Sequence, residues 1–351
     1  MKQNIIKRIE GYEKIGIIKN SFFPEELKKL TKHHFYKSKE YKKLLIYNKY
    51  DLNNVKLNKF PFVPTSLFKE ISLKSIKDNK IYKILTSSGT SGSAPSKIYL
   101  DRINAQNQTI ALSKIMSTVL GNHRLPMLII DQNPNVTKNT FSARVAAING
   151  FSIFGTDHEY ILDSNGKINK NKLRTFLNKY GSTKFFVFGF TSYVHKCFFE
   201  LIKVNKYDFS QGILLHGGGW KKMESKKISN QLFKKYLIKN FNFKEVIDYY
   251  GMVEQTGSIF LECKYCLNFM TSYYSDILIR DKNLDIVENG KKGLIQLFSL
   301  LPTSYPGHSI LTEDIGEIVK NNSCECSNIG KSFKVHGRST NSELRGCSDT
   351  I

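Results

Sequence analysis

Residues 86–93 of this chain consist only of Thr, Ser and Gly, and Lys97 follows them. Backbone N–H groups and hydroxyls in such a loop can contact phosphate oxygens, and glycines let the backbone approach closely. A nearby lysine adds a point charge. The loop does not fit the Walker A pattern. A phosphate-binding loop is therefore one interpretation, and a flexible turn is the other.

Two further segments place turn and polar residues directly after apolar runs. His216 and three glycines follow the run 212–215, with Trp220 beside them, while Glu254 lies in an aromatic, glycine-containing loop after 246–250. The carboxyl ends of strands in open α/β sheets are where ligands bind. A carboxylate there could hold Mg²⁺, and a tyrosine could stack on a purine. The plainer alternatives are a structural turn for the glycines, a pocket wall for His216 and a solvated loop acid for Glu254.

The elements that would position these residues predict an α/β fold with a mainly parallel sheet and a small β-rich C-terminal subdomain. Pro24 and the acids after it indicate a helix start near residue 24. We expect a basic helical segment at 1–80, an α/β core at 81–270 and a β-rich part at 271–351. The apolar runs are 125–130, 184–190, 212–215 and 246–250, and the main helical segments are 103–120 and 223–239.

Six cysteines occur in a chain whose N-terminus lacks the apolar core of an export signal. We therefore expect thiols, metal ligands or nucleophiles rather than disulfides. Cys263-x-x-Cys266 and Cys324-x-Cys326 form two close pairs, the usual unit of a four-thiolate zinc site. A structural Zn²⁺ is one prediction, and chance pairing is the alternative. Cys197 lies in an aromatic helical stretch and is expected in the core.

The charge balance is +23, from 53 Lys and Arg against 30 Asp and Glu. A nucleic-acid partner would explain it, but no block of five or six like charges occurs and Lys greatly exceeds Arg. We interpret the charge as a feature of the overall composition and do not expect nucleic-acid binding. No run of 18 apolar residues is present, so no transmembrane segment is expected. These features predict a soluble cytoplasmic protein.

Taken together, the motifs resemble the acyl-adenylate-forming superfamily, and within it the LuxE-like acyl-protein synthetases. The resemblance covers about residues 80–351 and rests on SSGTSGSAPSKI, HGGGWK, YGMVEQTGSIF, ILTEDIGEIV and KVHGRSTNSELRGCSDT. It implies the adenylate-forming fold, ATP and Mg²⁺ as requirements, a fatty or other carboxylic acid as substrate and an acyl-accepting partner protein such as an acyl reductase.

The resemblance also implies residue roles. Glu254 would ligate Mg²⁺, Asp314 would accept hydrogen bonds from the ribose hydroxyls, and Tyr250 and Gly251 would shape the adenylate pocket. Gly337 and Arg338 would form the segment that leads to the mobile C-terminal domain of relatives. The adenine side would be lined by Gly217, Gly218 and Gly219. The phosphates would be held by Thr86, Ser87, Ser88, Gly89, Thr90, Gly92 and Lys97.

Two departures from the superfamily pattern are visible. Val253 replaces the usual threonine before the glutamate, and the sequence ends 13 residues after Arg338, where most relatives continue for about a hundred. We therefore expect no full mobile C-terminal domain and no CoA ligase activity. Cys347 matches the cysteine that takes the acyl group in LuxE-like proteins. Arg345 would favour its thiolate and Gly346 would allow it to move. An incidental tail cysteine is the alternative.

The sequence therefore predicts an ATP-dependent acyl-protein synthetase that forms acyl-AMP and then loads Cys347 as a thioester. Three alternatives stay open. The first is a ligase for another acid, with an external thiol or amine acceptor, in glycan or lipid modification. The second is a basic nucleic-acid-binding or scaffold protein. The third, suggested by Val253, is a degenerate subunit that binds ATP without turnover.

Overall fold

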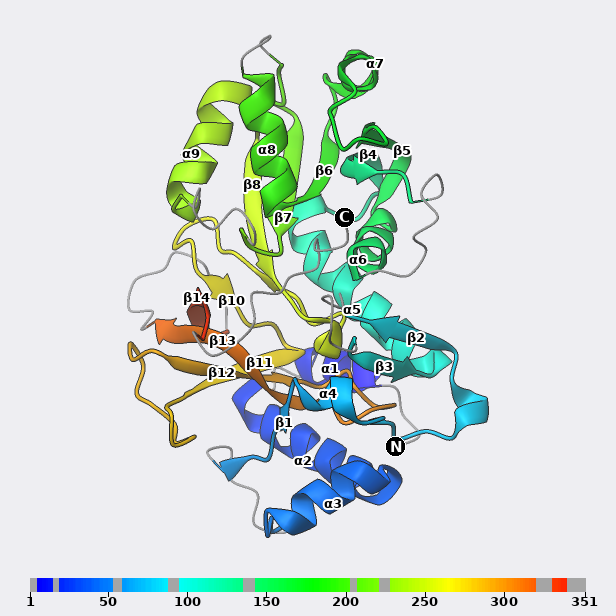
Figure 1. Cartoon of the computed structure of the whole chain (residues 1–351), viewed down its shortest axis with the longest axis vertical. Helices are drawn as coiled ribbons and strands as arrows, with labels where there is room; N and C mark the ends of the chain where they lie inside the picture. Colours follow the sequence, from blue (N-terminus) through cyan, green and yellow to red (C-terminus); the bar gives the residue numbers. More distant parts are fainter. Residues whose placement is uncertain are drawn as a thin grey trace. The chain divides into compact units, whose positions relative to one another are not determined.

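The structure is a computed structural model, which describes residues 5–14, 19–52, 59–87, 95–134, 143–202, 207–220, 228–319 and 330–339. The chain forms two compact units. Unit 1 contains residues 1–115 and 251–344, and unit 2 contains residues 116–250 and 345–351. Figure 1 labels the elements of both units. From the sequence we placed domain boundaries at residues 80 and 270, and that division stays a prediction.

Unit 2 is built on a parallel sheet in which the strands follow the order β5-β4-β6-β7-β8. Every residue of β6 and β7 is buried, which is typical of parallel strands covered on both faces. The predicted α/β class is confirmed, because four strands coincide with the apolar runs of the sequence. The strands are β4 (Leu125–Gln132), β5 (Gly155–Leu162), β6 (Phe185–Phe190), β7 (Gly212–Gly217) and β8 (Glu245–Tyr250).

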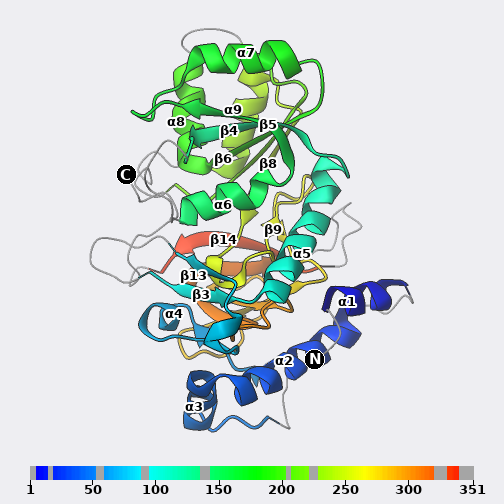
Figure 2. The ribbon, with the colours of Figure 1, turned by 90° about the vertical axis from the view of Figure 1, so that its right-hand side faces the viewer.

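Helices lie against the sheet of unit 2 (Figure 2). Aromatic side chains join them to the sheet and to one another. Phe151 packs on Phe188 of β6 with ring centroids 4.7 Å apart, and Phe198 and Phe241, which belong to two different helices, meet at the same distance. Cys197 is 2% exposed, so its predicted core position is confirmed. The helices are α6 (Ala143–Ser152), α7 (Lys170–Tyr180), α8 (Thr191–Leu201) and α9 (Asn230–Phe241). The helix predicted at 223–239 is found from Asn230 onward, and residues 221–227 lie outside the described part.

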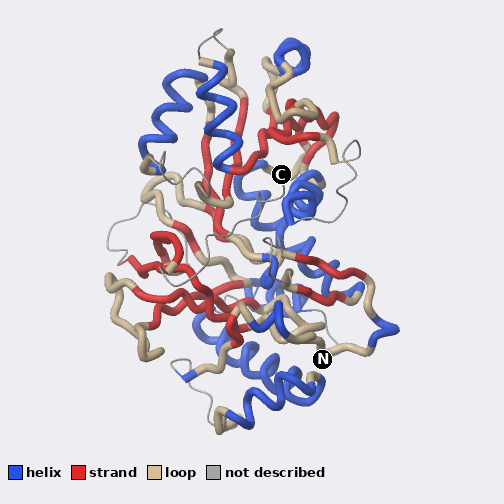
Figure 3. The backbone as a smooth tube through the Cα atoms, in the orientation of Figure 1, coloured by secondary structure: helices blue, strands red, loops and turns tan. Residues whose placement is uncertain are grey.

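Unit 1 contains a mainly antiparallel sheet with the order β10-β14-β13-β12-β11, and β1 pairs with β13 in parallel. β13 is the longest strand and carries the predicted ribose-contact segment. The sheet corresponds to the β-rich part predicted near the C-terminus (Figure 3). Its strands are β1 (Val63–Pro64), β10 (Phe269–Met270), β11 (Ser275–Arg280), β12 (Gly293–Ser299), β13 (Ser309–Val319) and β14 (Ser332–Arg338).

The N-terminal helices belong to the same unit as this sheet. They are α1 (Ile5–Lys14), α2 (Lys19–Lys37), α3 (Lys39–Tyr47) and α4 (Leu67–Glu70). α2 begins at Lys19 and contains Pro24, so the predicted helix start at Pro24 was wrong. Phe22 and Phe23 are 4% and 2% exposed. Burying these two rings favours a helix that starts before the proline. The free energy gained by their burial exceeds the cost of the backbone hydrogen bond that proline cannot donate.

A pair of stacked histidines fastens α2 to the loop after β12. The rings of His34 and His308 lie 4.8 Å apart and are both fully buried. His34 Nε2 donates to the Pro302 carbonyl at 3.0 Å, and the Ser75 hydroxyl donates to His34 Nδ1 at 2.7 Å. His308 Nε2 lies 2.9 Å from Thr31 Oγ1. Both imidazoles are neutral, because burial lowers the pKa of His308 to about 3 and that of His34 well below its usual value.

Among the described residues, no helix is both long enough and apolar enough to cross a membrane.

Candidate active site

A two-stranded hairpin in unit 1 carries the ends of the predicted phosphate loop. Strands β2 (Lys83–Thr86) and β3 (Lys97–Leu100) are antiparallel, and Thr86 lies opposite Lys97. The Ser96 N–H donates to Ser87 Oγ at 2.8 Å, and the Ser87 N–H donates to the Ser96 carbonyl at 3.1 Å. These two bonds fix where the loop leaves and rejoins the hairpin. Ser88, Gly89, Thr90 and Gly92 lie outside the described residues.

Strand alternation decides where Lys97 and its neighbours point. Ile98 and Leu100 are buried, whereas Lys97 is exposed and Thr86 is half-buried. In a strand, successive side chains face opposite sides. The apolar residues therefore hold the hairpin on unit 1, and the lysine ammonium stays accessible at the foot of the loop.

Glu254 is buried in a short 3₁₀ turn, η4 (Val253–Gln255), and is 5% exposed. Burial raises the pKa of its carboxyl group, and the Ser96 hydroxyl, Lys69 and Arg338 oppose that rise by favouring the charged form. The interpretation of Glu254 as a solvated loop acid was therefore wrong. Ser96, the residue that closes the phosphate loop, lies close enough to Glu254 to lower the pKa of its carboxyl group. Glu254 is therefore a neighbour of the hairpin.

Hydrogen bonds hold the η4 turn rigidly. The Tyr305 hydroxyl donates to the Glu254 carbonyl at 2.9 Å. The Gln255 amide donates to the carbonyls of Gly307 and Leu297 at 2.9 and 3.2 Å. Gly257, which ends the turn, has φ +87°, and a Cβ there would lie 2.7 Å from the Gln108 carbonyl oxygen. Only glycine satisfies both conditions without displacing α5 (Arg102–Leu120), so this glycine of the sequence motif has a structural reason.

Asp314 and Arg338 are brought together by strand register. They lie directly opposite each other on β13 and β14, with Arg338 Nε 3.7 Å from Asp314 Oδ1. The Thr312 hydroxyl accepts a hydrogen bond from the Asp314 N–H at 3.1 Å and itself donates to the Ile295 carbonyl. The acid is thus fixed, half-buried, in the middle of β13 and opposite the last residue of β14. The sequence named both residues, but it did not indicate that they pair.

The glycine turn predicted to contact adenine lies in unit 2, at the carboxyl end of β7. Gly217 is buried within the strand, and a Cβ there would lie 2.6 Å from Tyr249. Gly218 and Gly219 are exposed and have φ values of 82° and 68°. This left-handed backbone favours glycine, so the turn at the end of β7 explains why glycines occupy these positions. Tyr250 is the last residue of β8, and Gly251 is the first residue of the returning part of unit 1.

His216 is buried under this turn, and its tautomer follows from its partners. The Thr191 hydroxyl donates to the Gly217 carbonyl at 3.1 Å, so it accepts from His216 Nδ1 at 3.0 Å. Burial lowers the pKa of His216 to about 3, with Lys234 acting in the same direction. The ring is therefore neutral, and Asp248 Oδ1 lies 3.6 Å from the same nitrogen. His216 stabilises the turn from below.

A buried ion pair at the end of β4 was missed from the sequence. Asp131 lies 2.9 Å from Arg144, with side chains that are 2% and 11% exposed, and Arg144 also donates to the Tyr193 hydroxyl at 2.8 Å. Burial raises the pKa of Asp131 to about 6 despite the guanidinium. The available signal was an aspartate closing the apolar run of β4. Its partner is separated from it by residues 135–142, which lie outside the described part.

The predicted thiols are only partly placed. Cys263 and Cys266 are partly buried and share one turn, in which the Leu267 N–H donates to the Cys263 carbonyl at 2.9 Å. Cys324, Cys326 and Cys347 lie outside the described residues. Within the described ranges, no group of three or more His, Cys, Asp or Glu is arranged to hold a metal ion. The four-thiolate zinc site therefore stays a prediction.

Most of the chain shares its fold with adenylate-forming enzymes. A 2-hydroxyisobutyryl-CoA ligase, solved in an open conformation with 2-HIB-AMP and CoA, superposes with a TM-score of 0.71 at 13% identity, over 90% of this chain and 74% of that one. The luciferase-like enzyme of the mealworm Zophobas morio gives a TM-score of 0.50 at 18% identity, over 77% of this chain and 60% of that enzyme. At such identities the likeness concerns the fold, and the predicted adenylate-forming fold is confirmed.

Sequence relatives are more specific. The long-chain-fatty-acid--luciferin-component ligase of Aliivibrio fischeri is 25% identical over 304 residues, which are 82% of this chain and 76% of the relative. The ligase of the same name from Vibrio harveyi is 23% identical over 306 residues, 83% and 77% of the two chains. The family model described as "Acyl-protein synthetase, LuxE" matches residues 11–351. The chain therefore belongs to the LuxE acyl-protein synthetase family and is an acyl ligase of the adenylate-forming type.

Proposed function

We propose that this ligase activates a long-chain fatty acid with ATP and then transfers the acyl group to its own Cys347. The observation that carries the proposal is the buried Glu254, held rigidly beside the closing residues of a Ser/Thr/Gly loop in a chain of the LuxE family. The two curated relatives are named for long-chain fatty acids, which supports this choice of substrate.

Glu254 fits the role of a Mg²⁺ ligand. Its carboxylate is desolvated, its pKa is raised by burial, and the positive charges of Lys69 and Arg338 do not offset that cost. A cation beside the carboxylate would relieve the penalty, and Mg²⁺ prefers oxygen ligands. When bound, Mg²⁺ supplies charge neutralisation to the phosphates of ATP.

The remaining residues of the proposed site bind and orient ATP. The hairpin fixes Thr86 and Ser87 at the entry of the loop, and the accessible Lys97 ammonium contributes charge to the phosphates. Asp314 offers two carboxylate oxygens to the ribose hydroxyls, and Arg338 holds that carboxylate in place. In unit 2, Gly218 and Gly219 are exposed and carry no side chain, which supports the adenine contact that the family motif implies for them.

The reaction balances in two steps. A carboxylate oxygen of the acid attacks the α-phosphorus of ATP, a new P–O bond forms, and the bond to pyrophosphate breaks. The thiolate of Cys347 then attacks the acyl carbon of acyl-AMP, a C–S bond forms, and AMP leaves with the electrons of the C–O bond. Cys347 lies outside the described residues, so its role rests on its position in the family's C-terminal motif. The acyl group is then transferred from the Cys347 thioester to an acyl-accepting partner of the acyl-reductase kind, which leaves the Cys347 thiol free.

Intact-protein mass spectrometry tests both steps. Wild type, Cys347→Ala and Cys197→Ala are each incubated with ATP, Mg²⁺ and fatty acids of graded length, and pyrophosphate is measured in parallel. We expect an acyl-sized, hydroxylamine-labile mass gain in wild type and in Cys197→Ala, whose cysteine lies in the core, and loss of that gain in Cys347→Ala. Pyrophosphate release without an adduct in wild type would overturn the self-acylation step. Absence of both signals with every acid would overturn the fatty-acid assignment.

We carry a structural zinc site forward as a separate proposal. The described half of the site is compatible with this, because Cys263 and Cys266 lie in the same short turn and both residues are partly buried. Cys324 and Cys326 would complete four thiolates. Metal analysis of protein purified without chelator should give about one zinc per chain, and less after Cys263→Ser. A stoichiometry near zero in wild type would refute the site.

A further inference from the structure

The net positive charge is denser in the first 80 residues than in the rest of the sequence, so overall composition alone does not describe it. Residues 1–80 hold 19 Lys and Arg against 8 Asp and Glu, an excess of 11 out of the total of 23 in less than a quarter of the chain. All but one of these cations are lysines. In unit 1 this segment forms helices α1 to α4.

Helix α3 turns its lysines and two apolar side chains to the same side. Tyr41 and Leu45 are 0% and 2% exposed and pack inward. Lys39, Lys43, Ile46 and Tyr47 occupy the opposite face, because residues three and four apart share one side of a helix. Tyr47 is 87% exposed and Ile46 is 59% exposed. Glu40, the acidic residue of α3, is half-buried at the margin of that face.

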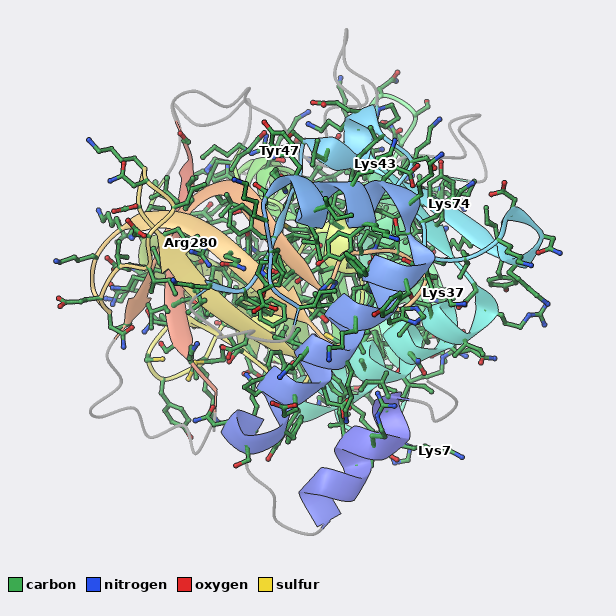
Figure 4. All side chains as sticks on the ribbon, turned by 90° about the horizontal axis from the view of Figure 1, so that it is seen from below. Lys7, Lys37, Lys43, Tyr47, Lys74 and Arg280 are labelled. Carbon is green, nitrogen blue, oxygen red and sulfur yellow. The ribbon has the colours of Figure 1, made fainter. Side chains whose placement is uncertain are left out.

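The end of helix α2 extends this surface. Tyr36 is 74% exposed, and Lys37 beside it is also exposed. Together they border an open cavity of about 760 Å³, which continues along Lys77, Lys80, Tyr82 and Arg102. We refer to Tyr36, Lys37, Lys39, Lys43, Ile46 and Tyr47 as the α2–α3 face. Figure 4 labels Lys37, Lys43 and Tyr47 along these two helices.

We propose that the α2–α3 face docks on an anionic membrane surface. Lysines attract acidic lipid headgroups, and exposed tyrosine and isoleucine side chains insert at the boundary between headgroups and acyl chains. A protein partner fits less well, because protein interfaces favour arginine and are depleted in lysine. Residues 9–101 contain no arginine. A nucleic acid would be attracted by the lysines, but its phosphates would not interact favourably with the apolar side chain of Ile46, which is 59% exposed.

The proposal rests on the proposed function in one respect, the origin of the substrate. A long-chain acid partitions into bilayers, so a ligase held at the surface draws on the local supply. Docking itself is measured without ATP or fatty acid. Absence of ligase activity would therefore not contradict the docking proposal, and absence of docking would not contradict the ligase assignment.

Vesicle sedimentation of the full-length protein tests the charge component. Vesicles of phosphatidylcholine alone are compared with vesicles containing 30% phosphatidylglycerol, at physiological salt. We expect binding only to the anionic vesicles. The Lys37→Gln, Lys39→Gln, Lys43→Gln variant should bind about a hundredfold more weakly, since each lysine near the surface contributes about fivefold. The matched control replaces three exposed lysines of unit 2, Lys235, Lys239 and Lys244, with Gln.

The apolar component has its own readout. The chain holds one tryptophan, Trp220, which is 8% exposed, so Tyr47→Trp adds a second indole at an exposed site. The difference emission spectrum against wild type should shift to the blue with anionic vesicles and not with neutral ones. Ile46→Ser with Tyr47→Ser should weaken binding, whereas Leu232→Ser with Ile238→Ser on α9 should not.

Three results would overturn the proposal. The first is absence of anionic-vesicle binding by wild type. The second is an equal loss in the α2–α3 and unit 2 lysine variants, which would show that overall charge drives binding. The third combines two observations: the difference spectrum of Tyr47→Trp does not shift with anionic vesicles, and wild type binds a DNA or RNA oligonucleotide whereas the α2–α3 lysine variant does not. That combination would assign the face to nucleic acid.

Discussion

Asp314 and Arg338 face each other on neighbouring antiparallel strands, with the carboxylate oxygen 3.7 Å from the guanidinium Nε. Asp314 lies in the middle of the predicted ribose-contact motif, and Arg338 lies in the segment that the family resemblance places before the mobile C-terminal domain of relatives. The register of β13 and β14 makes them one unit. The side chain that we propose for the ribose contact is thus tied to the last residue of β14.

We predict that Asp314→Asn raises the KM for ATP by about 10- to 100-fold with a smaller effect on kcat, since hydrogen bonds to a charged acceptor contribute about 1.5–3 kcal/mol. Steady-state pyrophosphate release measures it. Glu317→Gln is the control, because Glu317 pairs with Lys334 across the same two strands. An equal change in both variants would mean that the effect is one of sheet geometry and that Asp314 has no role in binding ATP.

Glu254→Gln should separate catalysis from stability. Removing the buried charge removes a desolvation penalty, so the thermal midpoint should stay the same or increase. Loss of the proposed metal ligand should lower pyrophosphate release by roughly 100-fold or more. Differential scanning calorimetry and the pyrophosphate assay test the two parts. A variant with unchanged turnover would remove Glu254 from the reaction.

The stacked histidines predict acid sensitivity. The pKa of His308 falls from about 6.5 in the unfolded chain to about 3 in the folded protein, so the folded state binds fewer protons within that window. The free energy of unfolding should therefore fall as pH decreases below 6.5, by about 1.4 kcal/mol per pH unit for this histidine. His34 and His216, whose pKa values are also lowered, act in the same direction.

Urea unfolding between pH 5.5 and 4.0, which lies between the unfolded and folded pKa values of His308, measures this slope. His308→Gln keeps a donor for Thr31 and should flatten the slope by about 1.4 kcal/mol per pH unit. The exposed His123→Gln should leave it unchanged. Equal slopes in wild type and His308→Gln would contradict the burial of a neutral imidazole at this position.

The Asp131–Arg144 pair should stabilise unit 2 only as a pair. Arg144→Met leaves a buried carboxylate without its partner and should cost about 3–5 kcal/mol of unfolding free energy. Adding Asp131→Leu should recover much of that loss, since replacing both members with apolar residues is often nearly neutral. The exposed pair Lys172–Glu159 is the comparison, and Lys172→Met should cost less than about 1 kcal/mol. Additive losses at Asp131 and Arg144 would contradict the coupling.

The sequence by itself determined the family, the fold class and the order of the motifs. Buried parallel strands such as β6 and β7 are continuous apolar runs, and glycines with left-handed backbone, such as Gly218, are marked by their type. These features are local along the chain. They can be read before any contact between distant residues is known.

Only the tertiary structure decided which polar residues are buried and with whom. The sequence marked Glu254 as an expected Mg²⁺ ligand but gave no sign of its burial, and Asp131 and His308 read as ordinary polar residues. Each of the three is almost fully buried. Their partners lie on other elements, as Arg144 does for Asp131, and strand register decided the pairing of Asp314 with Arg338. Burial and register are set by packing between segments far apart in sequence. The desolvation that shifts these pKa values therefore has no local signature.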